Sequence, residues 1–508
     1  MSIDKVVLAL HGAMKAKYGD KGLATIGKAL RELIAADKRR GVATSVIHLD
    51  DADEMSGYGG PTPAQPDARA VKAAIDRIVA GASPHYVLLL GGPDVMPMVP
   101  LANPAFSTTD GDTDPVVPSD LPYACDTPYS TNPNRFLGPT RVVGRLPDVV
   151  GARQPTLLAQ LIRAAARAKP RPRSDYQASF ALSAQAWEAS TALSLTNTFG
   201  HADQLQTSPP KGPRWSPAQL APRVHFINCH GGDSAPEFYG QPPGVEEYPV
   251  AHRAKSLRGK VSAGTVVAAE CCYGAQLYDP ADAGGEKGIA LAYLEDGAIG
   301  VFGSTTIAYG PSEGNGAADF VCQFFIQQVL GGSSLGRAAL EARQKFAGAR
   351  THLDPYDLKT LAQFYLLGDP SAQPVSFSAH ALARTKAFKK AFADTQDRTV
   401  RGLRRERLER EGRHLAKTLP PLKPADAAPA GKVAATLKAM ALESGLDAAA
   451  PAASFDIARK AGSAQRRIHV VQGRRPAGSP DAPVGRIVAL VATEEDGQLL
   501  HVRRLHSR

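Results

Sequence analysis

The sequence lacks the features of a disulfide-stabilised, membrane-bound or exported protein. Its five cysteines are few, odd in number and mostly embedded in apolar runs, which argues against a disulfide framework. No apolar run reaches about eighteen residues, and residues 1–5 have neither a basic leader nor an apolar leader core. We therefore expect a cytoplasmic protein that does not associate with membranes, because a reducing compartment suits cysteines that form no disulfide framework.

Nucleotide-binding loops are absent as well. The turn at Gly91-Gly92 follows the apolar run 86–90, as a phosphate loop would. Neither Gly-x-Gly-x-x-Gly nor Gly-x-x-x-x-Gly-Lys occurs, however, so nothing in the sequence supplies the backbone cradle that a phosphate group needs. We expect no cofactor.

Charge is distributed unevenly along the chain. Residues 1–375 carry 34 Lys and Arg against 36 Asp and Glu, whereas residues 376–508 carry 25 against 13. The surplus is densest at 401–413. Most charge runs are solvated helix faces, but this asymmetry also suits an acidic partner such as nucleic acid or an anionic protein surface. No zinc-finger, RRM or KH signature supports sequence-specific binding.

Strand and helix patterns alternate through the first 375 residues, which predicts an α/β unit with a mostly parallel sheet and helices on both faces. A basic helical segment and a small C-terminal β unit should follow. The expected units are the N-terminal half of the catalytic unit at 1–172, its second half at 173–375, the basic segment at 376–419, a linker with a possible helix at 420–465, and a β-hairpin unit at 466–508.

Two apolar runs end in reactive side chains. Residues 224–229 lead into His230-Gly231, and residues 265–270 lead into Cys271. Buried parallel strands read as continuous apolar runs, and their carboxyl ends meet at one edge of the sheet. An imidazole and a thiol brought together there are the groups required for nucleophilic acyl transfer.

The sequence resembles the gingipain-type cysteine peptidases, which belong to the caspase-fold group that includes clostripain and legumain. The resemblance rests on motifs spread over most of residues 1–375, namely His230-Gly231, Cys271-x-x-Gly274, 300–305 and 367–370, with 90–92, 119–123 and 144–147 upstream. It implies a caspase-like fold and peptide-bond hydrolysis by His230 and Cys271. It also implies an oxyanion hole made by the backbone N–H groups of Gly231 and Cys271.

Cys272 is the alternative nucleophile. Neighbouring residues on a strand point to opposite faces, so only one of the two cysteines can face His230. The Cys-x-x-Gly spacing selects Cys271, whereas the caspase-type Cys-x-Gly spacing selects Cys272. A zinc site made by Cys229, His230, Cys271 and Cys272 is the competing chemistry, but the same alternation and the missing Cys-x₂₋₄-Cys spacing argue against it.

The substrate cleft is harder to predict. The segment 304–309, which includes Ser304 and Thr305, should form one wall of the cleft, with Tyr309 as its aromatic element. A preference for basic substrates would require an acid in the pocket. The candidate acids are Glu188, Asp120, Asp233 and Glu313.

These patterns favour an intracellular, regulated cysteine endopeptidase that acts on protein or peptide substrates. Two alternatives remain open. The first is a catalytically silent scaffold of the same fold that binds peptides without cutting them. The second is a nucleic-acid-associated protein that acts through its basic tail.

Overall fold

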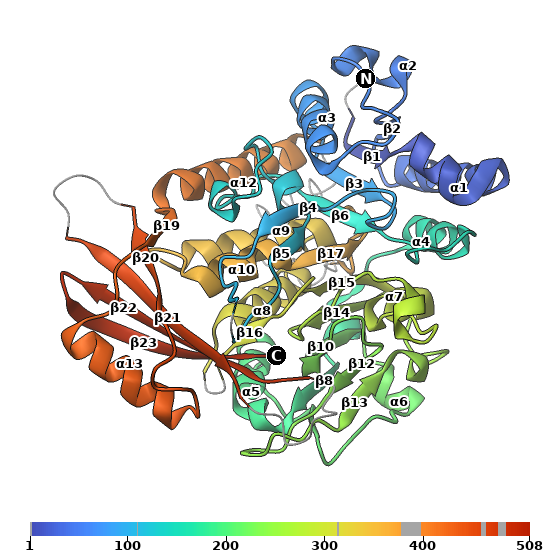
Figure 1. Cartoon of the computed structure of the whole chain (residues 1–508). Coiled ribbons are helices and arrows are strands. Elements are labelled where there is room, and N and C mark those ends of the chain that lie inside the picture. Colours follow the sequence, from blue (N-terminus) through green and yellow to red (C-terminus); the bar gives the residue numbers. More distant parts are fainter. Residues whose placement is uncertain (1–2, 109, 312–313, 377–397, 459–463, 476–483) are drawn as a thin grey trace, which may run out of the picture.

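A ten-stranded sheet runs through the centre of the molecule (Figure 1). The computed structural model describes residues 3–108, 110–311, 314–376, 398–458, 464–475 and 484–508. The strand order is β2-β1-β3-β6-β17-β15-β14-β10-β8-β9. The strands are β1 (Lys5–Ala9), β2 (Thr44–His48), β3 (Tyr86–Leu90), β6 (Val143–Leu146), β8 (Ser179–Ala184), β9 (Leu205–Ser208), β10 (Val224–Asn228), β14 (Thr265–Ala269), β15 (Ala298–Gly303) and β17 (Tyr365–Gly368).

All neighbouring strands of this sheet are parallel except β15 and β17. Strand β17 lies parallel to β6 and antiparallel to β15, so it joins the two expected halves of the catalytic unit into one continuous sheet. The predicted fold class is confirmed: the sheet is large, mostly parallel and flanked by helices, and its arrangement is caspase-like.

Helices cover both faces of the sheet because alternate strand residues point to opposite sides. Val6 and Leu8 of β1 belong to one core, whereas Val7 and Ala9 belong to the other. The first core is covered by α2 (Ala52–Met55), α3 (Ala68–Ala82), α5 (Glu188–Phe199), α8 (Ala317–Leu330), α9 (Leu335–Gly348) and α10 (Pro355–Gln363). The second is covered by α1 (His11–Arg39), α4 (Thr156–Arg167), α6 (Pro217–Leu220) and α7 (Ile289–Asp296).

The C-terminal strands form a six-stranded sheet that includes a strand of the catalytic unit. Its order is β16-β23-β22-β21-β20-β19. The elements are β16 (Tyr309–Gly310), β19 (Leu422–Ala425), α13 (Gly431–Glu443), β20 (Ala453–Ile457), β21 (Arg466–Arg474), β22 (Ile487–Glu495) and β23 (Gln498–Ser507). The stretch expected to be a linker, 420–465, therefore contributes two strands and a helix to this unit.

This second sheet is packed on both faces. Alternate residues of β22 separate into two cores: Ala489 packs toward Ile307 and Tyr309 of the catalytic unit, whereas Leu490 packs toward Leu437 of α13. The sheet is thus held between α13 and the catalytic unit. Figure 1 shows β23 running toward the carboxyl ends of the central strands, where the C-terminus lies.

The basic helix α12 (Arg398–Thr418) packs against the catalytic unit. Leu408 lies buried against Val142 and neighbouring apolar residues, and Arg401 donates to the carbonyl oxygen of Gly41 at 2.8 Å. Residues 377–397 of the expected basic segment lie outside the described residues. Binding of a polyanion to this region stays a prediction.

Three small sheets complete the strands. They are formed by β11 (His230–Gly231), β12 (Glu237–Tyr239) and β13 (Val250–Arg253); by β4 (Val99–Ala102) and β5 (Val116–Ser119); and by β7 (Arg171–Pro172) and β18 (Val375–Ser376). Across the described part of the chain, none of the helices combines the length and apolar character that a membrane span requires.

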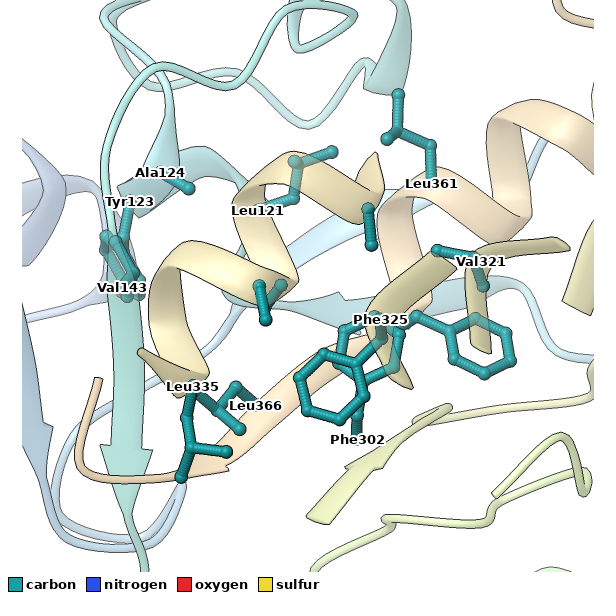
Figure 2. Close-up of a cluster of buried hydrophobic side chains, with 14 of the residues drawn as sticks. Leu121, Tyr123, Ala124, Val143, Phe302, Val321, Phe325, Leu335, Leu361 and Leu366 are labelled. Atoms are coloured by element: carbon teal, nitrogen blue, oxygen red, sulfur yellow. The ribbon is translucent and has the colours of Figure 1, made fainter. Parts of the chain in front are cut away.

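Phe302 belongs to the first core (Figure 2). Its ring stacks on Phe325 of α8, with centroids 4.6 Å apart. Leu366 of β17 and Leu335 of α9 belong to the same cluster, so this core joins strands β15 and β17 to helices α8 and α9.

We expect Phe302→Ala to lower the free energy of unfolding by about 3–5 kcal/mol, because it removes a fully buried ring and leaves a cavity. Urea denaturation would measure the change. The matched control is Leu403→Ala, whose side chain is 60% exposed on α12 and should change stability by no more than about 0.5 kcal/mol. Equal losses in the two variants would contradict this account of the core.

Candidate active site

The carboxyl ends of β10 and β14 bring the predicted histidine and cysteines together. The two strands are parallel neighbours in which Ile227 lies opposite Ala269, and the N–H of Glu270 donates to the carbonyl oxygen of Ile227 at 2.8 Å. His230 and Gly231 follow one strand, and the two cysteines follow the other. This is the sheet edge at which the sequence places the chemistry.

Two backbone N–H groups at this edge converge on one oxygen atom. Gly231 N and Cys272 N donate to the main-chain oxygen of Arg508 at 3.3 and 3.0 Å. A Cβ on Gly231 would lie 1.8 Å from the carbonyl oxygen of Cys272, so only glycine allows this approach. Such a pair of donors can stabilise the oxyanion of a tetrahedral intermediate. The sequence predicted Gly231 and Cys271 for this role; in the structure the second donor belongs to Cys272.

The two cysteine side chains lie in different surroundings. Cys271 belongs to the core beneath the sheet, with its Sγ 3.8 Å from the carbonyl oxygen of Ile227, and burial raises its pKa well above the ordinary value. Cys272 lies on the side of the C-terminal sheet, where its Sγ accepts from the N–H of Ala308 at 3.3 Å. Burial raises the pKa of Cys272 to about 12, and the nearby Lys359 ammonium opposes that rise.

His230 is buried and held by an amide. Its Nε2 lies 2.9 Å from Oε1 of Gln241, whose Nε2 in turn donates to the carbonyl oxygen of Val245 at 2.8 Å. Because the amide oxygen only accepts, Nε2 of the neutral imidazole carries the proton and Nδ1 keeps a lone pair. The ring packs against Trp187, with centroids 4.2 Å apart. Burial lowers the pKa of His230 to about 3, and the charge of Arg508 adds to the lowering.

The side chain of Arg508 fills an acidic pocket beside this site. It is completely buried, and its Nη2 lies 2.9 Å from Oδ1 of Asp319 and donates to the carbonyl oxygen of Pro311 at 2.6 Å. Its guanidinium lies 4.5 Å from the centroid of the Trp187 ring. A Cβ on Gly310 would lie 2.2 Å from Nη2, so a glycine there leaves room for the guanidinium.

Glu270 is the second acid of this pocket. It is fully buried, and its pKa is raised well above the ordinary value by burial and by the charge of Asp319, against the opposing effect of Arg508. Burial likewise raises the pKa of Asp319. Each of these buried carboxyl groups disfavours ionisation of the other, and a cation placed between them offsets that effect. The pair therefore favours a cationic occupant.

The structure places the other predicted substrate residues around the edges of the site. Ser304 Oγ donates to the carbonyl oxygen of Cys271 at 2.8 Å, and Thr305 Oγ1 donates to that of Pro118 at 2.8 Å. The hydroxyl of Tyr309 turns away to Asp112 at 3.0 Å, whereas the backbone of Tyr309 pairs with β23. These side chains therefore support the loops of the site.

The structure does not bring the candidate acids into the pocket. Asp120 forms a buried two-point ion pair with Arg145, at 2.9 Å to Nε and 2.6 Å to Nη2. Glu188 and Asp233 are exposed, and Glu313 lies outside the described residues. Within the ranges that the structure describes, no cluster of three or more His, Cys, Asp or Glu residues could hold a metal ion.

The sequence analysis did not single out five residues that the structure places at this candidate site, namely Glu270, Asp319, Trp187, Gln241 and Gly310. Glu270 and Asp319 carry a signal, because each is an acid inside an otherwise apolar run. Trp187 and Gln241 carry none, since only the fold brings them to His230.

Comparisons with known proteins place most of the chain in a sequence family. The sequence model of peptidase family C25 matches residues 24–375. A solved structure described as "Structure of Protease" aligns over 99% of this chain and 97% of that chain, with 13% identity and a TM-score of 0.44. No curated protein matches the sequence significantly.

The contacts of Asp120 yield a test of its role. We expect Asp120→Asn to lower the free energy of unfolding by about 3–5 kcal/mol, because the buried Arg145 loses its counter-charge. The KM for a peptide substrate should stay unchanged. Denaturation and steady-state kinetics would measure both, with the exposed Asp20→Asn as control. A raised KM with unchanged stability would place Asp120 in the cleft instead.

Proposed function

Because this chain belongs to peptidase family C25, the gingipain family of cysteine peptidases, we propose that it hydrolyses peptide bonds through Cys272 and His230. One observation carries the assignment: the N–H groups of Gly231 and Cys272 both donate to the main-chain oxygen of Arg508, and the carbonyl oxygen of a scissile bond could take the same place. The nucleophile of such a site sits on the residue whose N–H completes the pair. Cys272, the alternative nucleophile, fits this arrangement better than Cys271.

The mechanism follows from these positions. Nδ1 of His230 takes the proton of the Cys272 thiol, the resulting thiolate attacks the scissile carbonyl carbon, and the two N–H groups stabilise the negative charge that develops on oxygen. The C–N bond then breaks, and His230 delivers a proton to the leaving amine. Water, deprotonated by the same imidazole, hydrolyses the thioester and frees the thiol. Gln241 acts as a positioning residue that holds the ring by Nε2 and leaves Nδ1 for the proton transfers.

Arginine is the residue that we propose on the amino side of the cleaved bond. The pocket that holds Arg508 offers a carboxylate at 2.9 Å, a second buried acid and an aromatic face at 4.5 Å. Planar guanidinium suits all three because it forms directed hydrogen bonds and stacks on aromatic rings. Substrates are therefore proteins or peptides with an accessible arginine.

A reducing compartment such as the cytoplasm remains our proposed location. All five cysteines are free and buried. A peptidase of this kind requires a reduced thiol, which such a compartment maintains.

Alanine substitutions would decide which cysteine attacks. We expect Cys272→Ala to abolish hydrolysis and labelling by a thiol-directed peptide probe, whereas Cys271→Ala should keep much of both, because its sulfur lies in the core. Each cysteine variant should be measured both with Arg508 present and with Arg508→Ala, because the side chain of Arg508 occupies the proposed substrate pocket in the structure. The reverse cysteine result would return the nucleophile to Cys271. Absence of labelling in every background would favour the peptide-binding scaffold.

A second prediction concerns the pocket. In the Arg508→Ala background, where the chain's own arginine no longer occupies the pocket, Asp319→Asn should lower kcat/KM for an arginyl peptide on the order of a hundredfold, because the substrate guanidinium loses its charged partner. A peptide with a neutral residue in place of arginine should be affected far less. The control is Asp233→Asn, which changes an exposed acid near the site. Equal losses for both peptides would show that Asp319 does not select the substrate.

A further inference from the structure

We propose that β23 and Arg508 form a built-in inhibitor that occupies the substrate cleft of the resting enzyme. This inference rests on the proposed function and concerns the regulation of the same site. Residues 506–508 lie in the cleft as the three residues on the amino side of a scissile bond would lie. Activation then requires that this segment leave the cleft.

The backbone contacts of the segment are those of a bound substrate strand. Strand β23 pairs antiparallel with β16, with Ser507 opposite Tyr309 and His506 opposite Gly310. The N–H of Arg508 donates to the carbonyl oxygen of Ala308 at 2.9 Å. The main-chain oxygen of Arg508 accepts from the N–H groups of Gly231 and Cys272. Strand addition of this kind is a general mode of peptide recognition. A substrate needs the same backbone groups, so it cannot bind while β23 is in place.

The segment is presented to the cleft by its own sheet. Strands β22 and β23 form a hairpin across Asp496 and Gly497, whose φ angles of 50° and 81° are those of a tight turn. Even a short flexible tether raises the effective concentration of a ligand to the millimolar range. The packed sheet is more ordered than such a tether, so a dilute substrate competes poorly with the chain's own strand.

Ion pairs hold this sheet against the catalytic unit. Arg503 of β23 lies 2.7 Å from Asp354 at the start of α10. Arg486 lies 3.3 Å from Glu246, which also accepts from Nε2 of Gln241 at 3.3 Å. Because Gln241 positions His230, docking of the sheet is coupled to the geometry of the histidine.

The protonation states in the docked arrangement agree with a resting enzyme. The pKa of Cys272 is raised to about 12 and that of His230 is lowered to about 3, in both cases chiefly by burial. At neutral pH both groups are therefore uncharged, and little thiolate is present. Departure of Arg508 would remove a cation from beside His230 and admit water, and both changes bring the two pKa values closer together.

Substitution of Arg508 tests the inhibition directly. We expect Arg508→Ala to raise kcat/KM for an arginyl fluorogenic peptide at least about tenfold, because truncation of a buried anchor residue weakens docking by that amount or more. Labelling of Cys272 by a thiol-directed peptide probe should accelerate in parallel. The matched control is Arg504→Ala on the same strand, whose partner Glu443 lies 3.4 Å away outside the cleft. That variant should keep the wild-type rate.

A second variant covers a folding failure of the first. Arg503→Ala removes the contact with α10 and leaves the cleft intact, so it should also raise the rate. Circular dichroism would establish that each variant is folded. A wild-type rate in both folded variants would overturn the inference.

The segment can also be supplied as a free peptide. The peptide with the sequence of residues 502–508 should inhibit Arg508→Ala competitively, whereas the same peptide with alanine in place of arginine should not. Calorimetry on the Cys272→Ala, Arg508→Ala double variant would measure its binding without catalysis.

The outcomes separate the two proposals. Equal hydrolysis and labelling in wild type and in Arg508→Ala, without inhibition by the peptide, would overturn the inhibitor and leave the peptidase intact. Arginine-dependent binding of the peptide, with no hydrolysis in any variant, would overturn the peptidase and the inhibition together.

Discussion

The approach of two backbone N–H groups to a single oxygen is the constraint on which this site depends. Gly231 and Cys272 come from different strands, so their positions require the parallel register of β10 and β14, with Ile227 opposite Ala269. They also require a residue without a side chain at 231, because a Cβ there would lie 1.8 Å from a carbonyl oxygen. The cores on both faces of the sheet serve this register by holding the strands in place.

The second constraint is buried charge. Glu270 and Asp319 lie in the interior beside each other, where ionised carboxyl groups are costly unless a cation accompanies them. Arg508 supplies that cation in the structure, and a substrate arginine would supply it during turnover. The same electrostatic requirement underlies the arginine selectivity that we propose for the pocket, and it is met by the chain's own Arg508.

The C-terminal sheet is continuous with the catalytic unit through β16. It places apolar residues over Cys272 and Tyr309, and its last strand enters the cleft. A tail that the sequence predicts as an appended unit thus completes the surroundings of Cys272, the proposed nucleophile. The basic character of residues 376–508 is partly explained by this packing, since Arg486, Arg503 and Arg508 pair with acids of the catalytic unit.

Local patterns were sufficient to predict the caspase-like sheet and the strand ends that carry His230 and the cysteine pair. Continuous apolar runs and the alternation of strands with helices are properties of residues that are close in sequence, so they can be recognised without knowledge of the fold. The choice between Cys271 and Cys272 did not follow from them. Both occupy the same strand end, and only the packing on each side shows that one sulfur enters the core while the other faces the C-terminal sheet.

The pocket and its occupant were decided by contacts between distant parts of the chain. Asp319 belongs to α8, Glu270 follows β14, and Arg508 follows β23, so no spacing rule connects them. Asp120 is the converse case. Its motif suggested a contact with substrate, whereas in the structure its carboxylate forms an ion pair with the buried Arg145. A buried ionised acid is costly unless a cation pairs with it, and the tertiary arrangement of the strands and helices decides which cation lies within reach.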